Sequence, residues 1–226
     1  MRGLLAGTAL LLAAAAAPLG QSPGTGSIAG HVTLTPRVRG TPLPSNAYPS
    51  RAIQAHDVQA VPEIRNVVVY LKGVRYNGAL SASRVAIRQE HESFVPRVVA
   101  ITRGSTVDFP NADPFFHDVF SLSSAAAFDL GHYPPGQSRS EKFVKAGLVK
   151  VYCHIHSQMS ASILVLDHPY FTIPELDGNF TLPNVPPGHY TIVGWHERIG
   201  EYTTTVDVEA GKPSSVTLSL PVEDAP

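Results

Sequence analysis

The chain has almost no cysteine and no large excess of either charge. It has 1 cysteine in 226 residues, so no disulfide can form within it and the single thiol needs another explanation. Lys and Arg together number 17 against 18 Asp and Glu, which leaves no basic field to attract nucleic acid or an anionic membrane. Neither is expected as a partner. Apolar spacing typical of long amphipathic helices is also missing after the first residues.

The first residues read as a targeting segment rather than as part of the fold. Met1 and Arg2 form a short basic start, and residues 4–17 are an apolar run too short to span a bilayer, followed by small residues. This pattern predicts a secretory signal peptide over residues 1–20, cleaved between Ala17 and Gln21, and a periplasmic or secreted protein. No later segment is apolar enough to act as a membrane span.

The remaining composition indicates an all-β protein. The chain has 20 Pro and 18 Gly, which separate many short runs of Val, Ile, Leu and Thr. Residues 36–65 show no clear period, and no structure is predicted there. In the middle of the chain, apolar residues alternate as they do in half-buried strands. The predicted strands are 27–34, 66–71, a set between 83 and 166, 179–182, 189–196, 202–208 and 214–220.

The cysteine lies between two predicted strands. Alternation of side chains along a strand directs Cys153 to the same face as Val151, toward the core, and the outgoing strand directs Met159 to that face too. His156 is at the tip of the loop between them. Thiolate and thioether suit Cu(I), and imidazole suits both copper oxidation states. A second imidazole must come from a neighbouring strand, and the candidate is His117, which follows the strand near 105–109.

These residues resemble the cupredoxins, the family of plastocyanin and amicyanin. The resemblance covers residues 83–166 and rests on Gly104-Ser-Thr-Val-Asp-Phe-Pro-Asn111, on His117, and on Cys153-x-x-His156-x-x-Met159, a short ligand loop like that of amicyanin. It implies a Greek-key β-sandwich with one type 1 (blue) copper bound by His117, Cys153, His156 and Met159. It also implies an electron carrier, not an enzyme, that exchanges electrons with redox protein partners. The docking patch would include Pro114, Phe115 and Phe116.

Two positions near these ligands leave alternatives open. The family usually has Asn directly after the first ligand histidine, where it ties the ligand loops together, and Asp118 stands there instead. His154 is similar to the histidines that flank the ligand cysteine in multicopper oxidases, but Tyr152 occupies the other flank. A copper-handling protein is a further alternative. So are a structural envelope protein and a subunit of a copper oxidoreductase with a second metal at an interface involving His154 or His196.

A second resemblance lies after the first. The run Asp177-Gly-Asn-Phe-Thr-Leu-Pro-Asn-Val-Pro-Pro-Gly-His-Tyr-Thr-Ile192 is similar to the carboxypeptidase regulatory-like (transthyretin-like) β-sandwich. In that family two apolar strands precede the run, and here those strands lie before the cupredoxin-like segment. The expected organisation is an Ig-like/regulatory-like sandwich of residues 26–74 and 169–222, interrupted by a cupredoxin domain of residues 83–168. Two sequential domains are the alternative.

Overall fold

The computed structural model describes residues 24–37 and 62–224. The expected signal peptide and most of the segment from 36 to 65 lie outside the described residues. Within the described ranges the chain forms β-strands and one short 3-10 helix, η1 (Glu63–Asn66), so the all-β prediction is confirmed. No helix in these ranges is long and apolar enough to cross a membrane.

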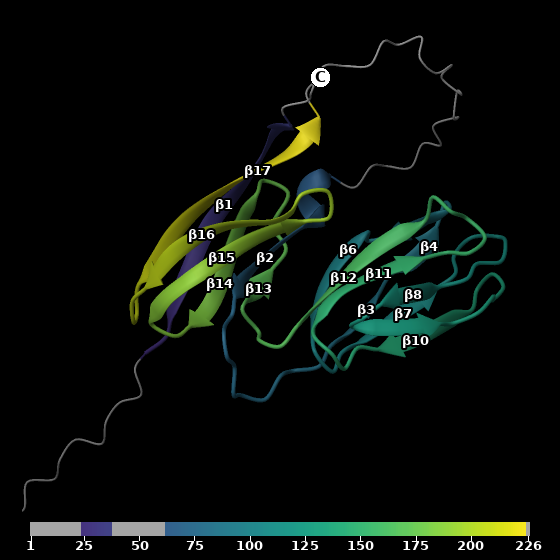
Figure 1. Ribbon diagram of the computed structural model, residues 1–226, viewed down its shortest axis with the longest axis horizontal. Helices are drawn as coiled ribbons and strands as arrows, with labels where there is room; N and C mark the ends of the chain where they lie inside the picture. Colours follow the sequence, from purple (N-terminus) through teal and green to yellow (C-terminus); the bar gives the residue numbers. More distant parts are fainter. Residues whose placement is uncertain (1–23, 38–61, 225–226) are drawn as a thin grey trace, which may run out of the picture.

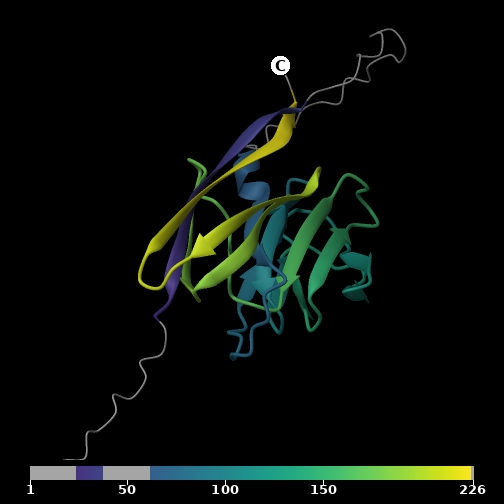
Figure 2. The ribbon, with the colours of Figure 1, turned by 60° about the vertical axis from the view of Figure 1, so that its left-hand side comes forward.

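Strands from both ends of the chain form one sandwich, which we call the terminal sandwich. Its outer sheet has the order β14 (Asn179–Val185), β1 (Gly26–Arg37), β17 (Pro213–Asp224). Its inner sheet has the order β13 (Phe171–Thr172), β2 (Val67–Lys72), β15 (Gly188–His196), β16 (Gly200–Val208). β1 and β17 run side by side in parallel although they lie at opposite ends of the sequence (Figure 1, Figure 2).

The intervening residues form a second sandwich, the central sandwich. One sheet has the order β6 (Val98–Thr102), β12 (Ser160–Leu166), β11 (Gly147–Tyr152), β8 (Phe120–Ser123), β9 (Ala126–Asp129). The facing sheet has the order β10 (Ser138–Lys142), β7 (Thr106–Pro110), β3 (Arg84–Ala86), and β4 (Arg88–Glu90) pairs with β5 (Ser93–Val95). The expected β-sandwich architecture is thus present in both parts of the chain.

The core of the central sandwich follows the alternation predicted from sequence. Along β12, Ala161, Ile163 and Val165 point into the core between its two sheets, together with Val149 and Val151 from β11. The apolar residues in between, Leu164 and Leu166, point the other way and are also buried. β12 is therefore covered on both faces, which explains its unbroken apolar run from Ile163 to Leu166.

The two sandwiches pack against each other sheet to sheet (Figure 1). Val68, Tyr70, Val193 and Trp195 of the terminal sandwich meet Val98, Leu164 and Leu166 of the central one. At the edge of this apolar contact, the Glu197 carboxylate lies 2.5 Å from Arg97 Nε and 3.5 Å from Lys150 Nζ. The contact therefore joins apolar burial to ion pairs between the two sandwiches.

The structure corrects the expectation of no structure over residues 36–65 at both ends of that segment. β1 continues to Arg37 because its backbone stays paired with β17, with Pro36 opposite Glu223 and Arg37 opposite Asp224. At the other end, η1 forms with an Arg65 N–H to Pro62 carbonyl bond of 2.9 Å, and Asn66 Nδ2 donates to Glu63 Oε2. Both gains come from hydrogen bonds that composition does not reveal.

Replacing Trp195 tests how far the two sandwiches depend on each other. Trp195 is 5% exposed in the contact between them, so we expect Trp195→Ala to lower the free energy of unfolding by about 3–5 kcal/mol. Chemical denaturation followed by circular dichroism measures the change. Leu122→Ala removes a Leu that is 84% exposed and should shift stability by no more than about 0.5 kcal/mol. Equal effects of the two variants would contradict the packing described.

His168 makes stability depend on pH. Burial lowers the pKa of its imidazole below the ordinary value, and its Nδ1 accepts a hydrogen bond from the Tyr170 N–H. Below about pH 6.5 the unfolded chain binds a proton that the folded chain resists, so the free energy of unfolding should fall as the pH drops. Denaturation curves between neutral and mildly acidic pH should show this fall in the wild type and a shallower one in His168→Gln. If the free energy of unfolding of His168→Gln fell with pH as steeply as that of the wild type, His168 would not be the source of the pH dependence.

Candidate metal centre

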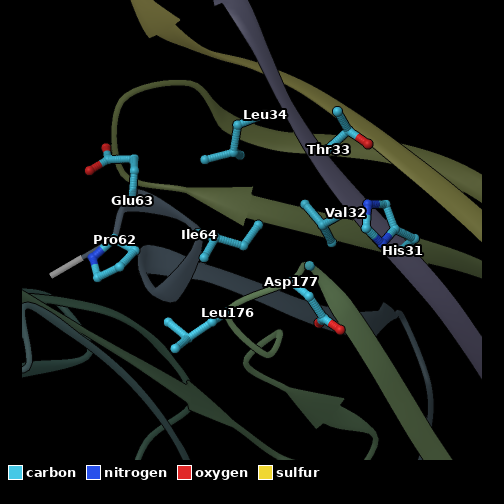
Figure 3. Close-up of a pocket in the computed structure, with 10 residues that line it drawn as sticks. His31, Val32, Thr33, Leu34, Pro62, Glu63, Ile64, Leu176 and Asp177 are labelled. Carbon is cyan, nitrogen blue, oxygen red and sulfur yellow. The ribbon is translucent and has the colours of Figure 1, made fainter.

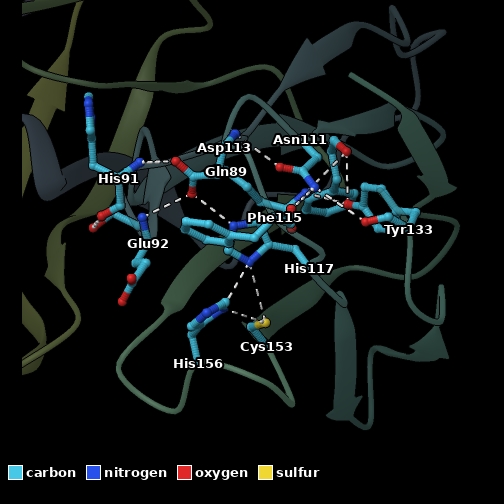
Figure 4. Close-up of polar contacts among 12 residues, drawn as sticks. Gln89, His91, Glu92, Asn111, Asp113, Phe115, His117, Tyr133, Cys153 and His156 are labelled. Atoms are coloured by element: carbon cyan, nitrogen blue, oxygen red, sulfur yellow. Dashed lines mark hydrogen bonds and ion pairs between the residues drawn. The ribbon is translucent and has the colours of Figure 1, made fainter. Parts of the chain in front are cut away.

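Three donor atoms converge at one end of the central sandwich. His117 Nδ1 and His156 Nδ1 are 3.1 Å apart, and Cys153 Sγ lies 3.8 Å from the first and 3.9 Å from the second (Figure 4). His117 is fully buried, Cys153 is 4% exposed and His156 is half-buried. The structure thus brings together three of the four residues that the sequence predicts as ligands.

Two loops supply these side chains. β11 and β12 pair from Gly147 opposite Val165 to Tyr152 opposite Ser160, so the chain between them turns at the end of the sheet. The Met159 N–H donates to the His156 carbonyl at 3.0 Å and closes that turn. His117 lies between β7 and β8 and is held by a two-way backbone bridge to Tyr133.

The spacing of the three atoms fits a single metal ion. A divalent ion typically has bonds of about 2.0 Å to imidazole nitrogen and about 2.3 Å to thiolate sulfur. The sum of any two such bonds exceeds the matching separation of 3.1, 3.8 or 3.9 Å, so one ion can reach all three atoms. Two nitrogens and one sulfur this close together in a buried space can share one cation. The residues present therefore fit a metal.

Met159 occupies the core beside this group. It is 1% exposed and belongs to the same buried cluster as Cys153, Val151 and Ala161. The predicted strand parity, which directs Cys153 and Met159 to one face, is confirmed. Coordination by its thioether stays a prediction.

A buried carboxylate orients the first histidine. Asp113 Oδ2 lies 2.8 Å from His117 Nε2, and the same carboxylate accepts the backbone N–H groups of His91 and Glu92 (Figure 4). Burial alone would raise the pKa of Asp113, but these hydrogen bonds lower it below its usual value. An ionised acceptor at Nε2 keeps the proton on that nitrogen and leaves Nδ1 free to bind a metal.

Asn111 and Phe115 shape the loop that carries Asp113 and His117. Asn111 Oδ1 accepts the Asp113 N–H at 3.0 Å, and its Nδ2 donates to the Phe115 carbonyl at 2.8 Å. The Phe115 ring packs against the imidazoles of His117 and His156, with ring centroids 5.2 and 5.3 Å away. Sequence reasoning missed the roles of Asp113 and Asn111. The only signal was their position shortly before His117 in a Pro-containing loop.

Asp118 has a partner that the sequence did not identify. Its Oδ1 lies 3.0 Å from Nδ1 of His154, whose ring stacks on Phe120 at a centroid distance of 3.7 Å. His154 is half-exposed, as expected for a residue that points away from the core. Asp118 therefore connects the loop of His117 to the loop of Cys153 through a side chain, although the resemblance led us to expect Asn at this position.

A separate pocket lies in the terminal sandwich (Figure 3). Its volume is about 340 Å³, and β1, η1 and the turn before β14 line it. Its carboxylates are engaged elsewhere, Asp177 by Asn179 and Glu63 by Arg198 and His196. It brings together no set of metal donors. The described residues of this pocket therefore suggest no chemistry of their own.

Comparisons with known proteins give partial likenesses. A family model described as polysaccharide lyase family 4, domain II, matches residues 155–216. The comparison with curated proteins gave no match.

Cupredoxins are among the structural neighbours. The copper-containing nitrite reductase of Thermus scotoductus SA-01 is 27% identical with a TM-score of 0.37, over 42% of this chain and 25% of that chain. Amicyanin of Paracoccus versutus is 22% identical with a TM-score of 0.35, over 40% of this chain and 86% of that chain. A purple cupredoxin of Nitrosopumilus maritimus is 20% identical with a TM-score of 0.33, over 36% of this chain and 99% of that chain. The present chain thus spans a quarter of the nitrite reductase.

Removing the charge of Asp113 tests its role in orienting His117. We expect Asp113→Asn to weaken metal binding by about 10–100-fold, because a neutral amide holds the imidazole tautomer less firmly. Competition against a chelator of known affinity measures the change. Asp207→Asn is the matched control, since Asp207 is an exposed carboxylate that pairs with His189 far from the centre. Unchanged affinity in Asp113→Asn would contradict the assigned role.

Proposed function

We propose that the chain binds one copper ion and carries single electrons between redox protein partners in the periplasm or outside the cell. In this proposal His117, Cys153 and His156 bind the ion and Met159 is a weak fourth ligand. The observation that supports it is the convergence of two imidazole nitrogens and one thiol in a buried space. The predicted signal peptide supports export.

The donor set suits a one-electron carrier. Bound copper would supply the change of oxidation state, since two imidazoles, a thiolate and a thioether accommodate both Cu(II) and Cu(I). The protein holds the proposed ligand side chains in fixed positions. Asp113 and Phe115 hold the His117 ring, and burial of His117, Cys153 and Met159 keeps water from completing the coordination. A site held in this way changes little between oxidation states.

His156 is the expected route for electrons. It is the most exposed of the proposed ligands, and apolar side chains lie on the same two loops, with Phe116 55% exposed and Ile155 47% exposed. Pro114 is exposed as well, whereas Phe115 is partly buried against the two imidazoles. An apolar patch of this kind suits the small and short-lived encounters of electron-transfer proteins.

We also propose that residues 26–74 and 169–222 are one regulatory-like domain, into which a cupredoxin domain of residues 83–168 is inserted. The pairing of β1 with β14 and β17, and of β2 with β13 and β15, supports this division.

A storage or delivery protein for copper would need a more open site. The burial of His117 and Cys153 favours an ion that stays in place.

Copper loading tests the electron-carrier proposal. Full-length protein given one equivalent of Cu(II) should show an intense visible band from thiolate-to-copper charge transfer, which ascorbate should bleach reversibly. Cys153→Ser should lose the band, because serine offers no thiolate, while the exposed-site control His189→Ala should keep it. A colourless wild type, or a band that persists in Cys153→Ser, would rule the proposal out.

A further inference from the structure

A second group of donors lies beside the proposed copper ligands and shares no atom with them. One donor atom each from Asp118, Asp129 and His154 lie within 4.8 Å of one another. The group therefore consists of two carboxylates and one imidazole. His132 lies at its edge and offers a second imidazole, with its Nε2 3.8 Å from Asp118 Oδ2.

Strand pairing places these four residues together. Phe120 of β8 lies opposite Asp129 of β9 and opposite Tyr152 of β11, so the residues just beyond these strand ends are neighbours. Asp118 precedes β8 and His154 follows β11. His132 is next to Tyr133, whose backbone is bonded to His117. The arrangement thus depends on the sheet itself.

The charges and distances of this group suit a cation. Asp118 is a buried carboxylate, 3% exposed, whose two oxygens face the imidazoles of His154 and His132. The separation of 3.8 Å between Asp118 and His132 is too long for a hydrogen bond but short enough for both atoms to bind one ion. His154 is restrained by its stacking on Phe120, and Asp129 Oδ1 is restrained by the Gly131 N–H at 2.7 Å.

We propose that Asp118, Asp129 and His154, joined by His132 at their edge, form a second metal site, which takes a divalent ion of the zinc, nickel or copper(II) class. Two imidazoles with two carboxylates suit these ions, whereas magnesium and calcium prefer oxygen ligands alone. His132, His154 and Asp129 are exposed, so an ion can enter from solvent.

This site is coupled to the first centre through the chain. Asp118 directly follows His117, and His154 directly follows Cys153. A divalent ion held there adds positive charge beside the first centre and favours Cu(I) over Cu(II). This coupling rests on the proposed function, whereas binding at the second site does not.

Zinc titration in a background without the first site tests binding directly. Cys153→Ser/His156→Ala removes two of the three donors of the first centre, and calorimetry with Zn²⁺ should still show one equivalent bound. Adding His154→Ala or Asp129→Asn should abolish that equivalent. Adding His189→Ala, an exposed histidine of the terminal sandwich, should retain it.

Two results would overturn the second site. One is no zinc binding in the background variant, which would mean that Asp118 and His154 only connect the two loops by their hydrogen bond. The other is zinc that stays bound after both His154→Ala and Asp129→Asn, which would place the ion elsewhere. If the background variant does not fold by circular dichroism, crystals of the wild type soaked in Zn²⁺ decide the matter. Anomalous density between the four side chains supports the site, and its absence refutes it.

The coupling has its own measurement. The reduction potential of copper-loaded wild type should rise when Zn²⁺ is added, and that of Asp129→Asn should not change. An unchanged wild-type potential under conditions where zinc is bound would overturn the coupling. A protein that binds zinc at the second site but shows no blue band would refute the electron-carrier proposal and leave the second site standing.

Discussion

The convergence of two imidazole nitrogens and one sulfur on a buried space is the constraint around which the central sandwich is organised. Each donor is held by contacts that do not involve a metal. The Asp113 carboxylate fixes the His117 ring, β-sheet parity turns Cys153 inward, and the turn closed by Met159 brings His156 opposite His117. Such prior organisation limits the rearrangement that a bound ion would undergo when its charge changes.

The same constraint links the candidate metal centre to the rest of the molecule. β12 leaves the ligand loop and is buried on both faces, with Ile163 in the central core and Leu164 against the terminal sandwich. The contact between the two sandwiches is therefore only one strand away from the proposed ligands. Glu197, which pairs with Arg97 and Lys150, adds an ionic contact at the edge of the same sheet. The terminal sandwich thus supports the sheet from which the ligand loop projects.

Local sequence patterns were enough to predict most strands and part of the candidate site. Alternation placed Cys153 and Met159 on one face, and the apolar runs located most strands, because a strand with buried faces leaves a direct trace in its sequence. Other features depend on contacts between distant segments. Asp113 and Asp118 acquire their roles from loops brought together by folding. The sequence of a loop does not reveal whether folding places a histidine beside its carboxylate. The contact around Trp195 was likewise invisible, because an outer face that packs on a second sandwich resembles any core face.

Copper-edge X-ray absorption on the copper-loaded, full-length protein reports which atoms surround the ion. We expect one sulfur at a short thiolate distance and two imidazole nitrogens per copper, with the sulfur signal lost in Cys153→Ser. A copper surrounded only by nitrogen and oxygen in the wild-type protein would contradict the proposed copper site.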